Sequence, residues 1–387
     1  MAKMLLHSLL LLLLLLDRHR NRVECEQVGI NYGRIADNLP SPSRVAKLIE
    51  SLGITKVKLY DADPTVLTAF ANTNVEFIVA IDNGKVTSML DSKQAEMWIQ
   101  QNIKPYLPAT RITCVTVGNE ILGGSQASLS ANLLPAMQSV YQALVSLGLS
   151  DQINVTTAHS LNILGSSYPP SSGAFGSDVA RYIKPILNFH SKVKSPFFIN
   201  AYPYFAYKAD PVTVKLPYVL FEKNAGVVDS GSNLKYDNML YAQIDSVYYA
   251  IKAMGHGDVD VRISETGWPS KGDSDEPGAT PENAGKYNGN LMERIKMNQG
   301  TPLKPNVPIE IYVFALFNED LKPGPTSERN FGLYYPNETP VYSLQGTSLA
   351  GDAGNGYFPE LFYSSSPPLI IAIQMSFYLY FLFYFFL

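Results

Sequence analysis

The chain has 387 residues, enough for one large barrel-type domain or for two domains of ordinary size. Its composition, 46% hydrophobic and 17% charged residues, is typical of a globular protein and excludes a disordered chain. The formal net charge of -4 gives no sign of the basic surface that nucleic-acid binding requires, so we expect no nucleic-acid partner.

The N-terminal segment has the pattern of a secretory signal peptide. Lys3 precedes an unbroken apolar run from Leu9 to Leu16, which is too short to span a bilayer. Three arginines follow this run, against the usual charge bias for export. We expect residues 1–25 to be removed.

Between residues 26 and 345, short apolar runs alternate with segments of helical periodicity. The runs are nearly continuously apolar, as expected for parallel strands that are buried on both faces. They are residues 28–32, 56–60, 77–81, 112–117, 155–158, 197–201, 259–263 and 309–317. The helical segments are residues 44–51, 65–71, 95–103, 131–147, 178–189, 241–254 and 282–296. Prolines at 42, 64, 135 and 281 lie near helix starts, where a missing N–H costs little.

This alternation predicts an α/β fold, a (β/α)8 TIM barrel that forms a single domain over residues 26–345. An open doubly wound sheet that binds a nucleotide would need a glycine-rich phosphate turn after its first strand, and residues 29–33 do not supply one. The chain after residue 345 is too small and too rich in glycine and serine to form a second domain.

Two glutamates stand at the ends of predicted strands, each close to a glycine. Glu120 follows the fourth strand and Glu265 the seventh. In a barrel of parallel strands, the carboxyl ends all point to one face, where active sites are built. We expect the two carboxyls to face one cleft. Such a pair suits glycoside hydrolysis, in which one carboxyl protonates the leaving oxygen and the other attacks or stabilises the sugar cation.

A third charged cluster follows the eighth strand. It contains Glu319, Lys322 and Glu328 in a glycine-rich segment. The lysine could form a plain surface salt bridge, or it could tune the charge of a catalytic carboxylate and hold a sugar hydroxyl. The sequence leaves both interpretations open.

Other chemistries have little support in the sequence. The five histidines show no metal-ligand spacing, and no Gly-x-Ser-x-Gly turn is present. We therefore expect no metal and no cofactor. His159 is interpreted as a loop or packing residue. Cys25 leaves with the signal peptide, and Cys114, in an apolar strand, is expected to be a small buried hydrophobe.

The C-terminal segment resembles a signal for a glycosylphosphatidylinositol (GPI) anchor. A short stalk of small residues, 346–368, is followed by an apolar tail, 369–387, with no lysine or arginine after it. We expect attachment at Asp352 or Asn355 and removal of the tail; a transmembrane tail is the alternative. Sequons at Asn154 and Asn337 are consistent with the secretory route.

Several motifs together resemble the plant endo-β-1,3-glucanases of glycoside hydrolase family 17, over about residues 26–345. The resemblance is greatest to the group with a GPI-type tail and no carbohydrate-binding appendage. The motifs are Gly29-Ile-Asn-Tyr-Gly33, Lys58-Leu-Tyr-Asp61, Val117-Gly-Asn-Glu120, Ile199-Asn-Ala-Tyr-Pro203, Ser264-Glu-Thr-Gly-Trp-Pro-Ser270 and residues 314–332.

The resemblance implies a (β/α)8 barrel that hydrolyses internal bonds of β-1,3-glucans such as callose, with retention of configuration. It implies Glu120 as general acid/base and Glu265 as nucleophile. The implied substrate-binding residues are Asn119 near the sugar 2-hydroxyl, Tyr202 beside the nucleophile, Tyr32 and Trp268 lining the cleft, and Glu319, Lys322 and Glu328 as a supporting charge cluster.

Retention would require the two carboxyls to lie about 5–5.5 Å apart, and the acid should have a raised pKa. Two other functions stay open: a transglycosylase that uses the same glutamates, and a glucan-binding wall protein with weak catalysis. We expect a monomer that is secreted and held at the outer face of the plasma membrane or in the cell wall.

Overall fold

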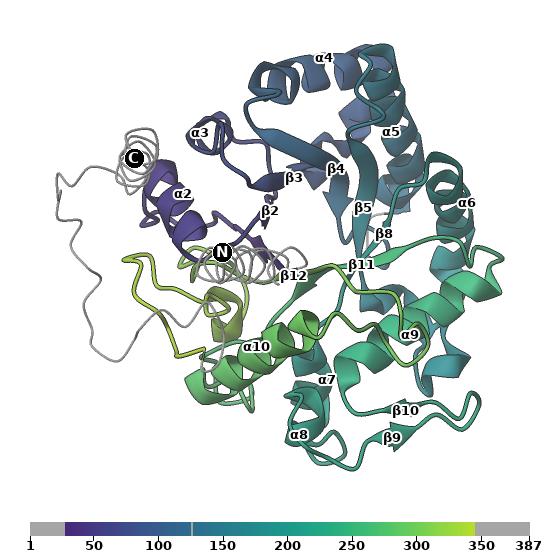
Figure 1. Cartoon of the computed structure of the whole chain (residues 1–387). Coiled ribbons are helices and arrows are strands. Elements are labelled where there is room, and N and C mark those ends of the chain that lie inside the picture. Colours follow the sequence, from purple (N-terminus) through teal and green to yellow (C-terminus); the bar gives the residue numbers. More distant parts are fainter. Residues whose placement is uncertain (1–27, 125–126, 345–387) are drawn as a thin grey trace, which may run out of the picture. The chain divides into compact units, whose positions relative to one another are not determined.

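The computed structural model describes residues 28–124 and 127–344, which form a closed barrel of parallel strands surrounded by helices (Figure 1). Around the barrel the strand order is β1-β12-β11-β8-β5-β4-β3-β2. Their bounds are β1 (Val28–Asn31), β2 (Lys56–Lys58), β3 (Glu76–Ile81), β4 (Arg111–Asn119), β5 (Asn154–Ser160), β8 (Phe197–Asn200), β11 (Val261–Thr266) and β12 (Ile311–Val313). The predicted (β/α)8 barrel is confirmed, and each predicted strand overlaps one of these.

The helices that connect the strands also follow the prediction. They are α2 (Pro42–Ser51), α3 (Pro64–Ala69), α4 (Ser92–Asn102), α5 (Ala127–Ser146), α6 (Ser177–Val193), α9 (Met239–Ala253) and α10 (Pro281–Lys296). Prolines open α2, α3 and α10, as expected, whereas Pro135 lies inside α5. The side chain of Asp63 caps α3 by accepting the backbone N–H groups of Thr65 and Val66.

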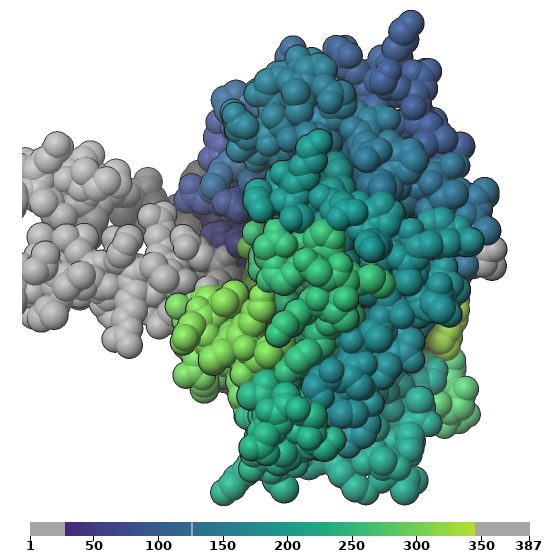
Figure 2. Space-filling model, turned by 90° about the vertical axis from the view of Figure 1, so that its right-hand side faces the viewer, coloured from purple at the N-terminus to yellow at the C-terminus, as the bar shows by residue number. Residues whose placement is uncertain are grey.

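Several short elements were not predicted, because each is only two to seven residues long and shows no periodicity. A hairpin of β6 (Leu164–Ser166) and β7 (Ala174–Phe175) follows β5. The connection after β8 contains α7 (Pro203–Ala209), α8 (Leu216–Val219) and a hairpin of β9 (Val227–Val228) and β10 (Lys235–Tyr236). Figure 2 shows how distant parts of the chain share one surface, with the blue first half above the teal and green second half.

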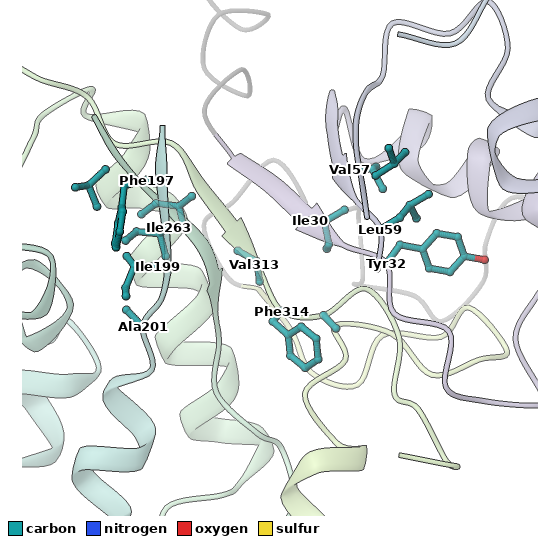
Figure 3. Close-up of a cluster of buried hydrophobic side chains, with 14 of the residues drawn as sticks. Ile30, Tyr32, Val57, Leu59, Phe197, Ile199, Ala201, Ile263, Val313 and Phe314 are labelled. Carbon is teal, nitrogen blue, oxygen red and sulfur yellow. The ribbon is translucent and has the colours of Figure 1, made fainter. Parts of the chain in front are cut away.

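Alternate residues of the barrel strands belong to two different hydrophobic clusters. Phe197 and Ile199 of β8 belong to the large hydrophobic cluster that includes the helices, whereas Phe198 belongs to a small cluster with Cys114 and Tyr312. Because successive side chains of a strand point to opposite faces, the small cluster fills the barrel interior. Figure 3 shows part of the large cluster. Cys114 is buried, as predicted.

The same alternation explains the position of Lys58. Its neighbours Val57 and Leu59 both lie in the large outer cluster, so the lysine between them faces the barrel interior. It is almost completely buried there, with 1% of its surface exposed. A buried lysine needs a partner, which the strand ends supply.

The predicted signal peptide, stalk and C-terminal tail lie outside the described residues. Within residues 28–124 and 127–344, no helix is long and apolar enough to cross a membrane.

Candidate active site

A large cleft opens at the carboxyl ends of the barrel strands. Its volume is about 910 Å3. Seven residues predicted from the sequence to act in catalysis or substrate binding line it, namely Asn119, Glu120, Tyr202, Glu265, Glu319, Lys322 and Glu328. The structure thus gathers residues from the ends of β4, β8, β11 and β12 around one space.

Glu265 is held by two donors on opposite oxygens. Lys58 Nζ lies 2.9 Å from Oε1, and the hydroxyl of Tyr202 donates to Oε2 at 2.9 Å. The side chains of Lys58 and Glu265 are 1% and 8% exposed, so water screens this ion pair little. The glutamate is fixed in orientation and only its edge is open to the cleft.

A one-residue bulge turns Glu265 toward the cleft. Val261 and Ile263 of β11 point into the outer core, and strict alternation would send Glu265 the same way. Instead, Ile263 pairs with Ile199 and Glu265 pairs with the very next residue of β8, Asn200. The register with β12 also shifts between Ile263 and Thr266. The extra residue reverses the direction of the side chain, which is a common role of bulges beside active sites.

Glu120 has a different environment. It lies in the left-handed region with φ 52°, and its backbone N–H donates to Ala158 O at 2.8 Å. The Nδ2 group of Asn200 donates to its Oε1 at 2.8 Å. Because Asn200 is also the strand partner of Glu265, one residue of β8 stands beside both carboxylates.

The two carboxyls differ in ionisation. Burial raises the pKa of the Glu120 carboxyl and the nearby charge of Glu265 raises it further, against the lowering by Asn200 and two lysines. For Glu265, burial alone would raise the pKa. The charge and hydrogen bond of Lys58, the Tyr60 hydroxyl and the charge of Lys322 outweigh it, so the pKa is lowered. The two pKa values are therefore shifted in opposite directions, up for Glu120 and down for Glu265.

Asn119 is fixed through its backbone. Its N–H donates to Asn83 Oδ1 at 2.7 Å, and its carbonyl accepts from Asn83 Nδ2 at 3.0 Å. The Oδ1 atom of Asn119 is buried and has no hydrogen-bond partner among the described residues. A buried acceptor without a donor is costly, and a sugar hydroxyl could satisfy it.

The third charged cluster lies on the cleft wall. Lys322 Nζ is 3.2 Å from Glu328 Oε2 and 4.1 Å from the centre of the Phe314 ring. Glu319 is buried and accepts the backbone N–H of Ile35 at 2.8 Å. Lys322 thus forms a salt bridge at the cleft, and its charge also lowers the pKa of Glu265, after the larger effect of Lys58.

Two predicted cleft residues are not in the cleft. Tyr32 is 2% exposed and packs edge-on against Phe317, at 6.1 Å between ring centres. Trp268 is fully buried, packs against Tyr204, and donates its indole N–H to Gly278 O at 2.8 Å. Both rings therefore lie in the core, where Trp268 is stable because its indole N–H has a hydrogen-bond partner.

Three important residues were missed as site residues. Lys58, Tyr60 and Asn200 were recognised only within motifs, yet the first two act on Glu265 and the third binds Glu120. Lys58 was the one that could have been found, because a lysine between Val57 and Leu59 in a buried strand requires an anionic partner.

The remaining predicted positions lie away from the cleft. His159 is buried and stacks on Phe197 at 4.7 Å, a packing role as expected. Asn154 is half-buried at the start of β5, beside a cavity of about 90 Å3 at the other end of the barrel. Asn337 is exposed in a turn, where its Oδ1 accepts from Thr339. In the part of the chain that the structure describes, no group of three His, Cys, Asp or Glu residues could hold a metal ion.

Comparison with known proteins adds independent findings. Residues 28–346 match the family described as glycosyl hydrolases family 17. Glucan endo-1,3-beta-glucosidase 14 of Arabidopsis thaliana is 54% identical over 365 residues, covering 94% of this chain and 91% of that protein. Glucan endo-1,3-beta-glucosidase 11 of the same plant is 60% identical over 319 residues, covering 82% and 75%. A solved structure, CJP38, a beta-1,3-glucanase and allergen of Cryptomeria japonica pollen, has a TM-score of 0.79 and 41% identity, covering 82% and 98%.

The Lys58–Glu265 pair leads to a prediction on pH dependence. In a Lys58→Met variant, burial acts on Glu265 without its main opposing charge, so the carboxyl becomes protonated at mildly acidic pH. Glu265 is the expected nucleophile and must be ionised to react, so the acidic limb of the kcat/KM profile on a β-1,3-glucan should move to higher pH. At pH 5 we expect a loss of roughly tenfold or more, because one pKa unit is a factor of ten.

Lys56→Met is the matched control. Lys56 lies on the same strand but pairs with Glu310, which lines the cavity at the other end of the barrel. This variant should leave the acidic limb in place. An unmoved limb in Lys58→Met would mean that Lys58 does not set the ionisation of Glu265.

Proposed function

The chain belongs to glycosyl hydrolases family 17 and is an endo-1,3-β-glucanase, and we propose that Glu120 and Glu265 carry out its reaction by retaining double displacement. The observation that carries the proposal is that two carboxyls line one cleft and that their surroundings shift the two pKa values in opposite directions, up for Glu120 and down for Glu265. A protonated acid beside an ionised nucleophile is the arrangement that this mechanism needs at its start.

In the first step, Glu265 attacks the anomeric carbon while Glu120 gives its proton to the leaving glycosidic oxygen. The bond from the anomeric carbon to that oxygen breaks, and a bond to a Glu265 oxygen forms. The donors on Glu265 suit this task, because Lys58 and Tyr202 hold both oxygens in a fixed direction.

In the second step, Glu120 acts as a base. The esterified Glu265 has no charge, so the repulsion that raised the pKa of Glu120 is absent. The carboxylate of Glu120 then accepts a proton from water, whose oxygen attacks the anomeric carbon and releases Glu265. One residue therefore acts as acid and then as base, with its pKa lowered by the chemistry itself.

The cleft suits a polysaccharide chain. It combines aromatic side chains, among them Tyr60, Phe205 and Phe331, with polar groups that can hydrogen-bond sugar hydroxyls. The acceptor Oδ1 of Asn119 is adjacent to Glu120 and supports binding of a sugar hydroxyl near the bond that breaks. We propose callose-like polymers as substrates. All these residues come from one chain, which supports a monomeric enzyme.

Loss of the proposed nucleophile should abolish the reaction. Glu265→Gln keeps the shape of the side chain but cannot form the ester, so kcat on laminarin should fall about a thousandfold or more. Glu282→Gln, on the exposed surface of α10, is a control with the same chemical change and should retain wild-type activity. The measurement is release of reducing ends.

Two outcomes would contradict the mechanism. Wild-type activity in Glu265→Gln would place the nucleophile elsewhere. A first-formed product of inverted configuration, detected by NMR within the first turnovers, would exclude double displacement. Labelled oligosaccharides in the same assay measure whether water or a second sugar receives the glucosyl group.

We propose that the chain is exported and held at the outer face of the plasma membrane or in the wall. The apolar run at 9–16 supports export, and the small residues, stalk and apolar end after residue 345 support a GPI anchor. Phosphatidylinositol-specific phospholipase C should release the active enzyme from intact cells. Enzyme that stays in the membrane after this treatment would favour a transmembrane tail instead.

Of the two sequons, we expect only Asn337 to carry a glycan. It is exposed in a turn, whereas Asn154 is half-buried in β5 and the hydroxyl of Thr156 in its sequon is buried and bonded to Pro196 O. Asn337→Gln should remove the mass shift that peptide-N-glycosidase F produces, and Asn154→Gln should leave it unchanged. A remaining shift in Asn337→Gln would place a glycan at Asn154.

A further inference from the structure

We propose that Glu276, a buried carboxylate outside the cleft, is a positioning residue that fixes the cleft wall formed by Lys322 and Glu328. The inference rests on the proposed function, because it assigns that wall to substrate binding. Glu276 does not line the cleft, and neither the sequence motifs nor the mechanism above gives it a role.

Glu276 lies in the loop between β11 and α10, and its side chain is fully buried. Each of its oxygens receives two donors. Oε1 accepts from Lys208 Nζ at 2.7 Å and from the hydroxyl of Ser327 at 2.5 Å. Oε2 accepts from the backbone N–H of Ser327 and of Asp273, both at 3.0 Å. A buried carboxylate with four donors is held firmly and holds its partners in turn.

These contacts join the chain segments that follow three of the barrel strands, β8, β11 and β12. Lys208 belongs to α7, which directly follows Tyr202, the residue that donates to Glu265. Glu276 itself is in the loop that follows Glu265 on β11. Ser327 is in the 3-10 helix Thr326–Arg329 that follows β12. One carboxylate thus links the segments that carry the nucleophile, its tyrosine partner and the charged wall.

Asp273 also binds the first residue of the 3-10 helix Thr326–Arg329. Its carboxylate accepts the backbone N–H of Thr326 at 2.8 Å and the Thr326 hydroxyl at 2.5 Å. Asp273 and Glu276 therefore bind two consecutive N–H groups, at Thr326 and Ser327. We call these two acidic residues the carboxylate clamp.

The clamped segment determines where Lys322 lies. Glu328, the next residue after Ser327, makes the salt bridge to Lys322 at 3.2 Å. Arg329 follows and donates to the backbone carbonyls of Lys322 at 3.1 Å and Gly324 at 2.9 Å. Glu328 and Arg329, which directly follow the two residues held by the clamp, thus bind both the side chain and the backbone of Lys322.

The expected consequence is on substrate binding more than on the chemical step. Glu265 keeps Lys58 and Tyr202 as direct partners whether or not the wall moves. A displaced wall would misplace Lys322 and Glu328 against the glucan, which weakens binding in the ground state and in the transition state alike. Such a loss raises KM and leaves kcat nearly unchanged.

Four variants test the clamp. Glu276→Gln replaces one acceptor oxygen by an NH2 group, which cannot accept the hydrogen bonds that converge there. Asp273→Ala removes the hydrogen bonds to Thr326, and because Asp273 is exposed, we expect this variant to fold. Asp275→Ala is the matched control, since this aspartate is exposed in the same loop and no hydrogen bond joins it to residues 326–329. Lys208→Met removes a partner of Glu276 but leaves both bonds to Ser327.

In laminarin hydrolysis, Glu276→Gln and Asp273→Ala should each raise KM by about fivefold to tenfold, the effect of losing one or two charge-assisted hydrogen bonds. The kcat should stay within about twofold. The acidic limb of the pH profile should move less than in Lys58→Met, because Lys322 lowers the pKa of Glu265 less than Lys58 does. Asp275→Ala and Lys208→Met should retain the wild-type KM, although Lys208→Met should lower the melting temperature.

Three outcomes would overturn the proposal. The first is an unchanged KM in both clamp variants, and the second is an equal KM increase in Asp275→Ala. The third is a KM that rises in proportion to the fall in melting temperature across all four variants. If Glu276→Gln does not fold, Asp273→Ala carries the test. The outcome is independent of Glu265→Gln, because KM is compared among active variants, so failure of the catalytic assignment and failure of the clamp are distinguishable.

Discussion

The ion pair between Lys58 and Glu265 is the interaction on which the rest of the site depends. Two charges in the barrel interior are stable only together, because each alone would lose its hydration without compensation. The pair is possible because Lys58 projects inward between two outward residues and because the bulge in β11 turns Glu265 to meet it. Tyr202 then completes the coordination of the carboxylate.

The same pair separates the roles of the two glutamates. Both carboxyls are affected by burial, which raises their pKa values, but only Glu265 has a lysine in direct contact. Glu120 has the amide of Asn200, which is neutral, and the negative charge of Glu265 nearby. Lys58 on β2 makes the largest contribution to this asymmetry, and the charge of Glu265, after burial, raises the pKa of Glu120.

The sequence predicted the fold well because parallel barrel strands are buried on both faces and appear as short apolar runs. Helix starts at Pro42, Pro64 and Pro281 were equally visible. The site was predicted in part. Strand ends gave Glu120 and Glu265, but the bulge could not be seen, because a register shift depends on the pairing of neighbouring strands. The family resemblance implied a place in the cleft for Trp268, yet the residue packs against Tyr204 and donates a hydrogen bond to Gly278 O within the core.

The structure supports its catalytic groups in two different ways. Lys58 and Asn200, which bind the reacting carboxyls, stand on strands of the barrel, and their positions are fixed by the ladder of the sheet. Lys322 stands on the loop after β12 and Glu328 on the short 3-10 helix within that connection, and neither residue belongs to a barrel strand. A loop that binds a polymer needs another constraint, and carboxylates that accept consecutive backbone N–H groups provide one. In the proposed mechanism, the chemistry thus rests on the barrel and recognition of the glucan rests on contacts between loops, where a change of sequence need not disturb Glu265.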